Sequence, residues 1–329
     1  MNNIKIAVYE ISGFQEEYLK TKLQGLDVEY HAGKFAEAEH SEAEIVSTFT
    51  QSHIGPESLA VLPNLKYVAT RTTGFDHINV TGLAEKNVLV SNVPTYGENT
   101  VAEYAFALII ELSRKMYPTL KRVREQKQYS YEGLVGFDLK GKTLGVIGTG
   151  HIGAFAIKIA KGYSMEVLGY QPQPNEALAQ EFGFTNVSLE ELLKRSDIVT
   201  LHVPYMPATH HLMGAEQFAL MKDKSIFINT ARGGLVDTQS LLGALKSGKL
   251  TGAGLDVLEN EPALKAALAD SSAPKDEVTA ANLELMAMAN VLITPHNAFQ
   301  TTEAIERILD TTADNIKAYI AGIPQNILK

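Results

Sequence analysis

The sequence predicts an α/β protein with two doubly wound parallel sheets, and three observations support this fold class. Short β-prone runs alternate with helical patterns along most of the chain, which is typical of parallel sheets. One strand-to-helix turn carries a glycine fingerprint. The chain is also long for a single core, at 329 residues. We therefore expect two domains, of which only one carries the fingerprint.

The first part of the chain, residues 4–98, alternates strand-like and helix-like runs without a glycine fingerprint. A helix is expected at Gln15–Leu23. Strands are expected at Ile4–Val8, Val28–His31, Ala43–Phe49, Tyr67–Thr70 and Val88–Ser91. The segment Thr72–Asp76 follows one of these strands, and its glycine can expose backbone N–H groups to an anion. An ordinary turn would have the same sequence, so both interpretations stay open at this point.

A long helix is expected over Asn99–Tyr117, after a break in regular structure at Val93–Gly97. Its residues are apolar nearly all round, so it should be buried against two surfaces, at a domain interface or a subunit interface. The charged run Lys121–Tyr131 is expected to wrap over the surface. A domain boundary is therefore expected near residue 98.

The segment Thr143–Gly153 contains a short apolar strand followed by glycines in G-x-G-x-x-G spacing. Gly148 allows the tight turn, Gly150 lets the backbone approach a pyrophosphate, and Gly153 lets helix and strand pack closely. The following helix supplies free N–H groups and the positive end of its dipole to the phosphates. A helix to Gly162 and a strand at Glu166–Tyr170 complete a βαβ unit, so we expect dinucleotide binding rather than a purely structural turn.

The alternation continues after this unit and gives six strands in the second domain. The further strands are expected at Ile198–Val203, Ser225–Thr230, Gly252–Leu258 and Val291–Thr294. Helices are expected after the capping box Ser188–Glu191, at Ala215–Met221, from Asp237 or Thr238 to Gly248, within Ala263–Ala289, and at Thr301–Ala321.

Composition excludes several classes of protein. Lys and Arg number 29 against 38 Asp and Glu, a net charge of −9, which disfavours a general nucleic-acid or acidic-membrane binder. The absence of cysteine excludes disulfides, thiolate metal sites and cysteine nucleophiles. The first residues are typical of a strand, not of a signal peptide, and the most apolar stretch, Tyr104–Ile110, is too short to span a bilayer. We expect a cytoplasmic protein with no membrane or nucleic-acid partner.

An arginine, a carboxylate and a histidine each follow a predicted strand of the second domain: Arg232, Glu261 and His296. Each alone is compatible with an ordinary surface or loop residue. In an open parallel sheet, however, the carboxyl ends of strands form the ligand site, so the three are expected to converge. Arginine binds a carboxylate bidentately, histidine exchanges one proton near neutral pH, and a neighbouring carboxylate stabilises the imidazolium form. Hydride transfer to a 2-keto acid needs these functions and a nicotinamide, and no motif indicates a metal.

These motifs together resemble the D-isomer-specific 2-hydroxyacid dehydrogenases over essentially the whole chain. The matching segments are G-T-G-H-I-G (148–153), L-H-V-P (201–204), N-T-A-R-G-G-L-V-D (229–237), G-L-D-V (254–257), E-N-E-P (259–262) and T-P-H-N-A (294–298). The resemblance implies a Rossmann nucleotide domain at 99–298 inserted in a flavodoxin-like substrate domain at 1–98 and 299–329. It also implies a homodimer formed through the helix region 99–117.

The resemblance also assigns roles to residues. Arg232 would bind the substrate carboxylate and carbonyl, His296 would be the general acid in reduction, and Glu261 would be its partner. Asp256 would lie beside the nicotinamide carboxamide, and backbone N–H groups of Thr72–Asp76 would hold the substrate carboxylate. The expected substrate-binding residues are Phe49, Thr73, Gly74, Tyr96 and Phe299. The expected cofactor-binding residues are Gly148, Gly150, His151, Ile152, Gly153, Gln171, His202, Val203, Pro204, Thr230, Ala231 and Asp256.

Within the family, Tyr96 and Phe49 resemble the D-lactate dehydrogenase subgroup, which implies reduction of pyruvate or a close 2-keto acid. Glyoxylate or hydroxypyruvate reduction is the second choice. Formate dehydrogenases of this fold carry glutamine at the place of Glu261, which argues against that activity. Related corepressors use the dinucleotide to control assembly, but this chain keeps the Arg, Glu and His set and lacks their disordered tails.

One position departs from the family pattern. About 20 residues after the glycines, such proteins place an acidic residue on the adenine ribose. Gln171 occupies that place here. Glutamine keeps one acceptor and removes the repulsion of a 2′-phosphate, but no Lys or Arg in this turn attracts one. We therefore expect NAD to be the cofactor with relaxed preference, so that NADP is tolerated or preferred.

Overall fold

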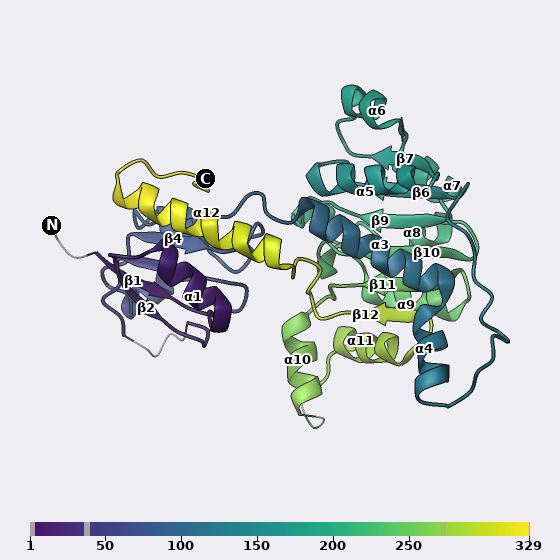
Figure 1. Ribbon diagram of the computed structural model, residues 1–329, viewed down its shortest axis with the longest axis horizontal. Helices are drawn as coiled ribbons and strands as arrows, with labels where there is room; N and C mark the ends of the chain where they lie inside the picture. Colours follow the sequence, from purple (N-terminus) through teal and green to yellow (C-terminus); the bar gives the residue numbers. More distant parts are fainter. Residues whose placement is uncertain (1–3, 36–39, 271, 273, 329) are drawn as a thin grey trace. The chain divides into compact units, whose positions relative to one another are not determined.

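The computed structural model describes residues 4–35, 40–270, 272 and 274–328. The chain forms two compact units, Met1–Tyr96 with Gln300–Lys329 and Gly97–Phe299 (Figure 1). We call them unit 1 and unit 2. Their limits lie within two residues of the predicted domain boundaries, while the substrate and nucleotide roles of the two domains stay a prediction.

Unit 1 is built on a five-stranded parallel sheet in the order β2-β1-β3-β4-β5. Its strands are β1 (Lys5–Val8), β2 (Asp27–Tyr30), β3 (Ile45–Thr48), β4 (Tyr67–Thr70) and β5 (Leu89–Ser91). Its helices are α1 (Gly13–Lys22), the 3₁₀ turn η1 (Pro56–Ala60), α2 (Val80–Ala84) and α12 (Thr302–Ile320). Apolar side chains of α1 and α12 cover one face of the sheet, and those of η1 and α2 cover the other. The predicted α/β class is therefore confirmed for unit 1, and its loops at the carboxyl ends of β3 and β4 carry the candidate residues Phe49, Thr73 and Gly74.

Unit 2 is built on a seven-stranded parallel sheet in the order β12-β11-β10-β9-β6-β7-β8. Its strands are β6 (Thr143–Ile147), β7 (Glu166–Tyr170), β8 (Thr185–Asn186), β9 (Ile198–Leu201), β10 (Ser225–Asn229), β11 (Leu250–Leu255) and β12 (Val291–Ile293). The sequence predicts six of them. It misses β8 because two residues are too short for a periodic pattern. The winding direction changes at β6, which lies between β7 and β9, and ligands of such sheets bind outside the strand ends at this point.

Helices cover both faces of this sheet (Figure 1). They are α3 (Glu98–Arg114), α4 (Met116–Arg124), α5 (His151–Gly162), α6 (Glu176–Phe182), α7 (Leu189–Arg195), η2 (Pro207–Thr209), α8 (Ala215–Leu220), η3 (Gly233–Leu235), α9 (Thr238–Lys246), α10 (Glu261–Ala269) and α11 (Glu277–Ala287). The predicted capping box is present at the start of α7, where Ser188 accepts a hydrogen bond from the Glu191 N–H.

The predicted helix Asn99–Tyr117 is wrong at its end. The structure ends α3 at Arg114, passes through Lys115 in the left-handed conformation (φ 51°), and begins α4 at Met116. Pro118 explains the break, because in a continuous helix it could not donate to the Arg114 carbonyl and its ring would clash there. Three residues into a new helix, the same proline is tolerated because its missing N–H would have no partner.

The apolar surface of α3 is covered within unit 2. Ala102, Phe106 and Ile109 pack in the core cluster that also contains α5 and the strands β6 and β10. The buried residues of α3 are thus covered by α5 and the sheet, while Tyr104, Ile110 and Leu112 stay partly exposed. The alanine-rich region 263–289 also differs from one continuous helix, since α10 ends at Ala269 and Asp276 caps the start of α11 by accepting from the Thr279 N–H.

Candidate active site

The glycine turn after β6 has the tight geometry that the fingerprint predicts. Gly148 has a φ of 94°, and a Cβ on it would lie 2.4 Å from the His202 carbonyl oxygen. A Cβ on Gly153 would lie 2.0 Å from the Gly148 carbonyl oxygen. Gly150, which precedes the first helical residues His151 and Ile152 of α5, has open space around its missing Cβ. The turn is therefore closed where strand and helix pack and open at the helix N-terminus, whose free N–H groups can bind an anion.

Three buried polar atoms at the carboxyl ends of the central strands have no hydrogen-bond partner among the described residues: Thr149 Oγ1, His202 Nδ1 and Thr230 Oγ1. They follow β6, β9 and β10, whose last residues pair in register across the sheet. Burial lowers the pKa of His202 to about 4, so its ring is neutral near pH 7. Buried polar atoms normally have partners, and those of a nicotinamide dinucleotide suit this row of neutral donors and acceptors. Val203, Pro204 and Ala231 continue the same loops.

Gln171 is the first residue after β7, and the position agrees with the register used to predict it. Tyr170 pairs with Ile147, and the Tyr170 carbonyl accepts a hydrogen bond of 2.8 Å from the Gly148 N–H. The Gln171 side-chain amide donates to the Gln173 carbonyl at 2.7 Å. This bond orients the Gln171 side chain within its own turn, beside the glycine turn.

His296 and Glu261 form an ion pair in unit 2. His296 Nδ1 lies 3.2 Å from Glu261 Oε1 and 3.3 Å from Oε2. Burial alone would raise the pKa of the Glu261 carboxyl, but the His296 hydrogen bond and charge, with the Leu258 N–H, lower it below its usual range. Glu261 is therefore ionised near neutral pH, and its carboxylate faces His296 Nδ1.

Asp256 holds the loop that carries His296. Its buried carboxylate accepts hydrogen bonds from Thr294 Oγ1 at 2.5 Å, the Asn297 N–H at 3.0 Å and the Ala298 N–H at 2.9 Å. Its carbonyl accepts from the His296 N–H at 2.8 Å, and His296 has a left-handed backbone (φ 56°). The sequence predicts Asp256 only as a cofactor contact. The structure adds that its carboxylate binds three donors of the loop and so positions the histidine.

Arg232 follows β10 on a loop that packs closely against the loop after β11. Its side chain is half-buried and donates from Nη1 to the Ala231 carbonyl at 2.7 Å. A Cβ on the next residue, Gly233, would lie 2.0 Å from the Leu258 carbonyl oxygen. Since Leu258 also donates to Glu261 at 3.4 Å, this close approach brings the Arg232 loop beside the Glu261–His296 pair.

A second ion pair, which sequence reasoning missed, ties these loops together. His211 Nε2 lies 2.7 Å from Glu259 Oε1, and Thr238 donates to the other carboxylate oxygen at 2.8 Å. The His211 N–H donates to the Gly234 carbonyl at 2.9 Å. The loops that follow β9, β10 and β11 are thus cross-linked immediately beside Arg232 and Glu261. The sequence offers only an isolated histidine two residues after η2. No local pattern around it indicates its distant partner.

The candidate substrate residues of unit 1 are held by a buried arginine that the sequence analysis also missed. Arg71 donates to the carbonyls of Tyr9 and Glu10 at 2.5 and 2.9 Å and to Ser47 Oγ at 3.0 Å. Burial lowers the pKa of Arg71 to about 10, so it stays charged near neutral pH. The Glu10 carboxylate accepts from the Phe49 N–H at 2.6 Å. The carboxyl ends of β1, β3 and β4 are thereby fixed to one another.

Hydrogen bonds also hold Thr73 and Tyr96, through the side chain of the first and the backbone carbonyl of the second. Thr73 Oγ1 donates to the Val93 carbonyl at 2.8 Å, and Arg307 Nε donates to the Tyr96 carbonyl at 2.6 Å, both within unit 1. Phe299 is the last residue of unit 2. Phe49, Thr73, Gly74 and Tyr96 therefore belong to unit 1, and the catalytic set belongs to unit 2.

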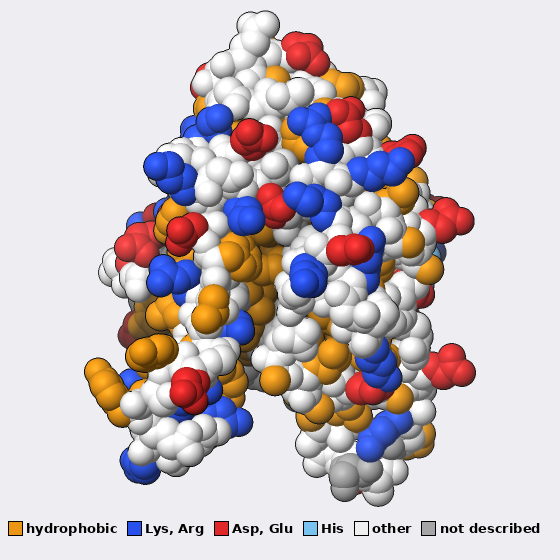
Figure 2. Space-filling model, turned by 90° about the vertical axis from the view of Figure 1, so that its right-hand side faces the viewer, with side chains coloured by type: hydrophobic (Ala, Val, Ile, Leu, Met, Phe, Trp, Pro, Cys, Tyr) orange, Lys and Arg blue, Asp and Glu red, His pale blue; other side chains and the backbone are white. Residues whose placement is uncertain are grey.

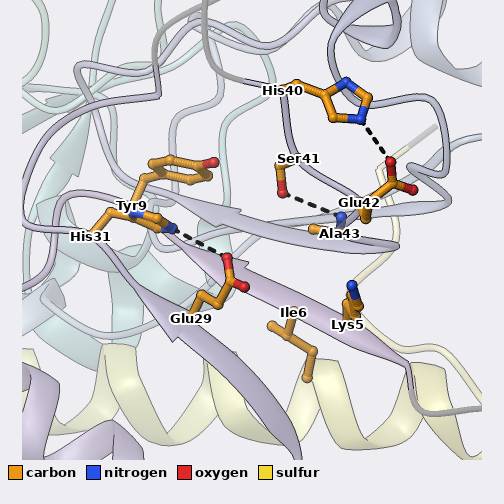
Figure 3. Close-up of a pocket in the computed structure, with 9 residues that line it drawn as sticks. All are labelled: Lys5, Ile6, Tyr9, Glu29, His31, His40, Ser41, Glu42 and Ala43. Atoms are coloured by element: carbon orange, nitrogen blue, oxygen red, sulfur yellow. Dashed lines mark hydrogen bonds and ion pairs between the residues drawn. The ribbon is translucent and has the colours of Figure 1, made fainter.

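A cavity of about 260 Å³ lies elsewhere in unit 1 (Figure 3). It is lined by β1, β2 and the segment before β3, with Tyr9 stacked on His31 and His40 paired with Glu42. None of the predicted site residues lines it, so it is not the candidate active site. Among the described residues, no group of His, Asp or Glu has a metal-binding arrangement, and no helix has the length and apolarity needed to cross a bilayer.

Known proteins are similar to this chain over most of its length. The family model for the NAD-binding domain of D-isomer-specific 2-hydroxyacid dehydrogenases matches residues 106–298. A D-lactate dehydrogenase of Escherichia coli is 35% identical over 95% of this chain and 96% of its own length. A glycerate dehydrogenase of Methylorubrum extorquens is 37% identical over 83% of this chain and 82% of its own length. The solved D-lactate dehydrogenase of Aquifex aeolicus, complexed with NAD and lactic acid, has a TM-score of 0.87 at 35% identity, covering 97% of this chain and 96% of that one. The chain belongs to the NAD-dependent D-isomer-specific 2-hydroxyacid dehydrogenases.

Proposed function

We propose that this enzyme reduces a small, pyruvate-like 2-keto acid to the D-2-hydroxy acid, and that D-lactate formation is its main activity. The Glu261–His296 pair beside the Arg232 loop carries the proposal, because it supplies a proton donor and a carboxylate binder in one unit. When bound on the glycine turn and the row of Thr149, His202 and Thr230, NADH supplies the hydride.

The side chains divide the remaining work. Arg232 binds the substrate carboxylate and carbonyl through its planar guanidinium. His296 turns Nδ1 to Glu261, so Nε2 is the atom that donates a proton to the carbonyl oxygen as the hydride reaches the carbon. Glu261 binds Nδ1 and so orients the ring for that step. In unit 1, backbone N–H groups of the Thr73–Gly74 loop hold the carboxylate.

The choice of pyruvate rests on Tyr96 and Phe49, which resemble the D-lactate dehydrogenase subgroup. The relatives do not decide the substrate, since one is a D-lactate dehydrogenase and another a glycerate dehydrogenase. Steady-state reduction of pyruvate, glyoxylate and hydroxypyruvate, each with NADH and NADPH, tests the proposal. The highest kcat/KM is expected with pyruvate. The lactate formed from pyruvate should be consumed only by a D-specific lactate oxidase. A higher kcat/KM with glyoxylate or hydroxypyruvate would make the second choice the function.

Glu261→Gln should move the pH profile of reduction rather than abolish the activity. Reduction needs the protonated imidazolium, so activity is high on the acid side of the limb and falls as pH rises. His296 lowers the pKa of the Glu261 carboxyl. A carboxylate beside an imidazole favours its charged form, and the neutral amide of glutamine does not. The alkaline limb of kcat/KM should therefore shift to lower pH. Glu277→Gln, at the exposed start of α11, is the matched control, and an unshifted limb in Glu261→Gln would refute the pairing.

Gln171→Asp should shift cofactor preference towards NADH. The added carboxylate would accept the ribose hydroxyls of NADH, a charged hydrogen bond contributing about 1.5–3 kcal/mol, and would repel the 2′-phosphate of NADPH. The ratio of the two KM values should change at least about tenfold, with kcat nearly constant. Gln173→Asp adds the same charge two residues along the turn and should leave the ratio unchanged. Equal effects of both variants would mean that Gln171 does not face the ribose.

We propose that the enzyme is a homodimer, as the resemblance implies, but with its contact extended beyond α3. Apolar side chains are exposed along α4 and the segment after it: Met116, Tyr117, Leu120, Val123, Tyr129, Tyr131 and Val135. Figure 2 shows hydrophobic side chains on this side of the molecule between Lys and Arg side chains. A run of exposed apolar side chains of this kind, in which Tyr129 is 99% exposed, marks an interaction surface. Sedimentation of the wild type and of Val123→Glu would measure the assembly.

A further inference from the structure

The C-terminal segment Asn326–Leu328 lies along the edge of the sheet in unit 1. Ile327 forms an antiparallel bridge with Ser91 of β5, which is the end strand of the sheet. The Leu328 N–H donates to the Val90 carbonyl at 2.8 Å, and the Asn92 N–H donates to the Asn326 carbonyl at 3.2 Å. The segment therefore reaches Asn92, the first residue after β5, from which the chain continues to Tyr96.

Three side-chain amides connect this segment to the candidate substrate loop. Asn326 Nδ2 donates to Asn315 Oδ1 at 2.8 Å, Asn315 Nδ2 donates to the Asn92 carbonyl at 2.9 Å, and Asn92 Nδ2 donates to the Thr73 carbonyl at 2.8 Å. Asn315 and Asn92 are 1% and 8% exposed. Water cannot easily replace the bonds that these two buried residues make, so they fix the Asn92 backbone and the Thr73 carbonyl.

The last bond of this series fixes a single peptide plane. The Thr73 carbonyl and the Gly74 N–H belong to one planar trans peptide, so they point in opposite directions. Because the carbonyl is held by Asn92, the Gly74 N–H must point away from Asn92. A second pair of bonds, from the Val93 N–H to the Thr72 carbonyl at 3.0 Å and from Thr73 Oγ1 to the Val93 carbonyl, prevents the loop from turning over.

We propose that Asn326, Asn315 and Asn92 form a positioning relay that aims the Gly74 N–H at the substrate carboxylate. The inference rests on the proposed function, in which this loop binds that carboxylate. A donor on the carbonyl also polarises the peptide and strengthens its N–H as a donor to an anion. The relay makes the chain's C-terminal segment, which contains none of the predicted site residues, a determinant of affinity for 2-keto acids.

Two variants separate the relay from general stability. Asn326→Gly removes the first amide while glycine suits the left-handed backbone there (φ 53°). Asn92→Asp replaces the donor on the Thr73 carbonyl by a repelling carboxylate. The KM for pyruvate should rise about three- to tenfold in Asn326→Gly and at least about tenfold in Asn92→Asp. The KM for NADH should stay constant in both, because the glycine turn lies in unit 2.

Amide hydrogen exchange supplies a readout that does not depend on turnover. Exchange of the Val93 N–H, which donates to the Thr72 carbonyl of the loop, should quicken in both variants. Asn64→Ala, which breaks an exposed amide–carboxylate bond to Glu42 in the same unit, should change neither exchange nor KM. Unchanged exchange in Asn326→Gly, or equal rises in the KM values for pyruvate and NADH, would overturn the relay. If the wild type reduces no 2-keto acid, the proposed function fails, and the exchange result still decides whether the amides hold the loop. If Asn92→Asp does not fold, Asn326→Gly alone decides.

Discussion

His296→Gln is expected to lower kcat for pyruvate reduction by about 10²- to 10⁴-fold, the range that general acid–base catalysis contributes. Glutamine keeps a hydrogen-bonding side chain of similar length but cannot donate a proton with the acidity of an imidazolium. The KM for NADH should change little, because the cofactor residues lie on other loops. Stopped-flow mixing of enzyme and NADH with pyruvate measures the hydride step directly.

His40→Gln is the matched control for this prediction, since His40 is an exposed histidine that also pairs with a glutamate, Glu42. It should leave all rates unchanged. A His296→Gln enzyme with a wild-type hydride step would remove His296 from the role of general acid.

Arg232→Lys is expected to lower kcat/KM for the keto acid by about 10²-fold, or about 2.7 kcal/mol of transition-state stabilisation. Lysine keeps the positive charge but loses the planar fork that binds a carboxylate with two parallel hydrogen bonds. In the wild type, one N–H of the guanidinium donates to the Ala231 carbonyl and so orients the group. A lysine ammonium cannot make this bond and bind the substrate carboxylate with two bonds at the same time.

Arg195→Lys tests the same exchange on the exposed face of α7, where Arg195 pairs with Glu191, and should have no kinetic effect. NADH binding, measured by fluorescence titration, should be equal in both variants and the wild type. If Arg232→Lys retained its kcat/KM, bidentate recognition by Arg232 would be excluded.

The parts of the fold that follow local rules could be predicted from the sequence. The turn at Gly148–Gly153 depends on residues next to each other, and the structure has it as predicted. The family was confirmed because its motifs are also local. The helix predicted over Asn99–Tyr117 runs past the break at Lys115, because the effect of Pro118 falls on the carbonyl four residues before it.

The support behind the candidate site could not be predicted, because its contacts join distant residues. Arg71 contacts Tyr9, Glu10 and Ser47, and none of these spacings forms a periodic pattern. Asp256 was predicted by resemblance, but its hold on the His296 loop depends on the pairing of β11 with β12. The roles of Arg232, Glu261 and His296 stay predictions, and the kinetics above test them.

The left-handed backbone of His296 implies a trade between stability and activity. A φ of 56° is strained for histidine. Glycine adopts this conformation without strain, and asparagine adopts it more readily than most other residues. The loop bonds to Asp256 offset that cost in the native protein. Replacement by glycine or asparagine should therefore relieve the backbone strain of the loop, at the cost of the ion pair with Glu261, while removing turnover. Under the proposed function, backbone stability and proton donation therefore place opposite demands on this one position.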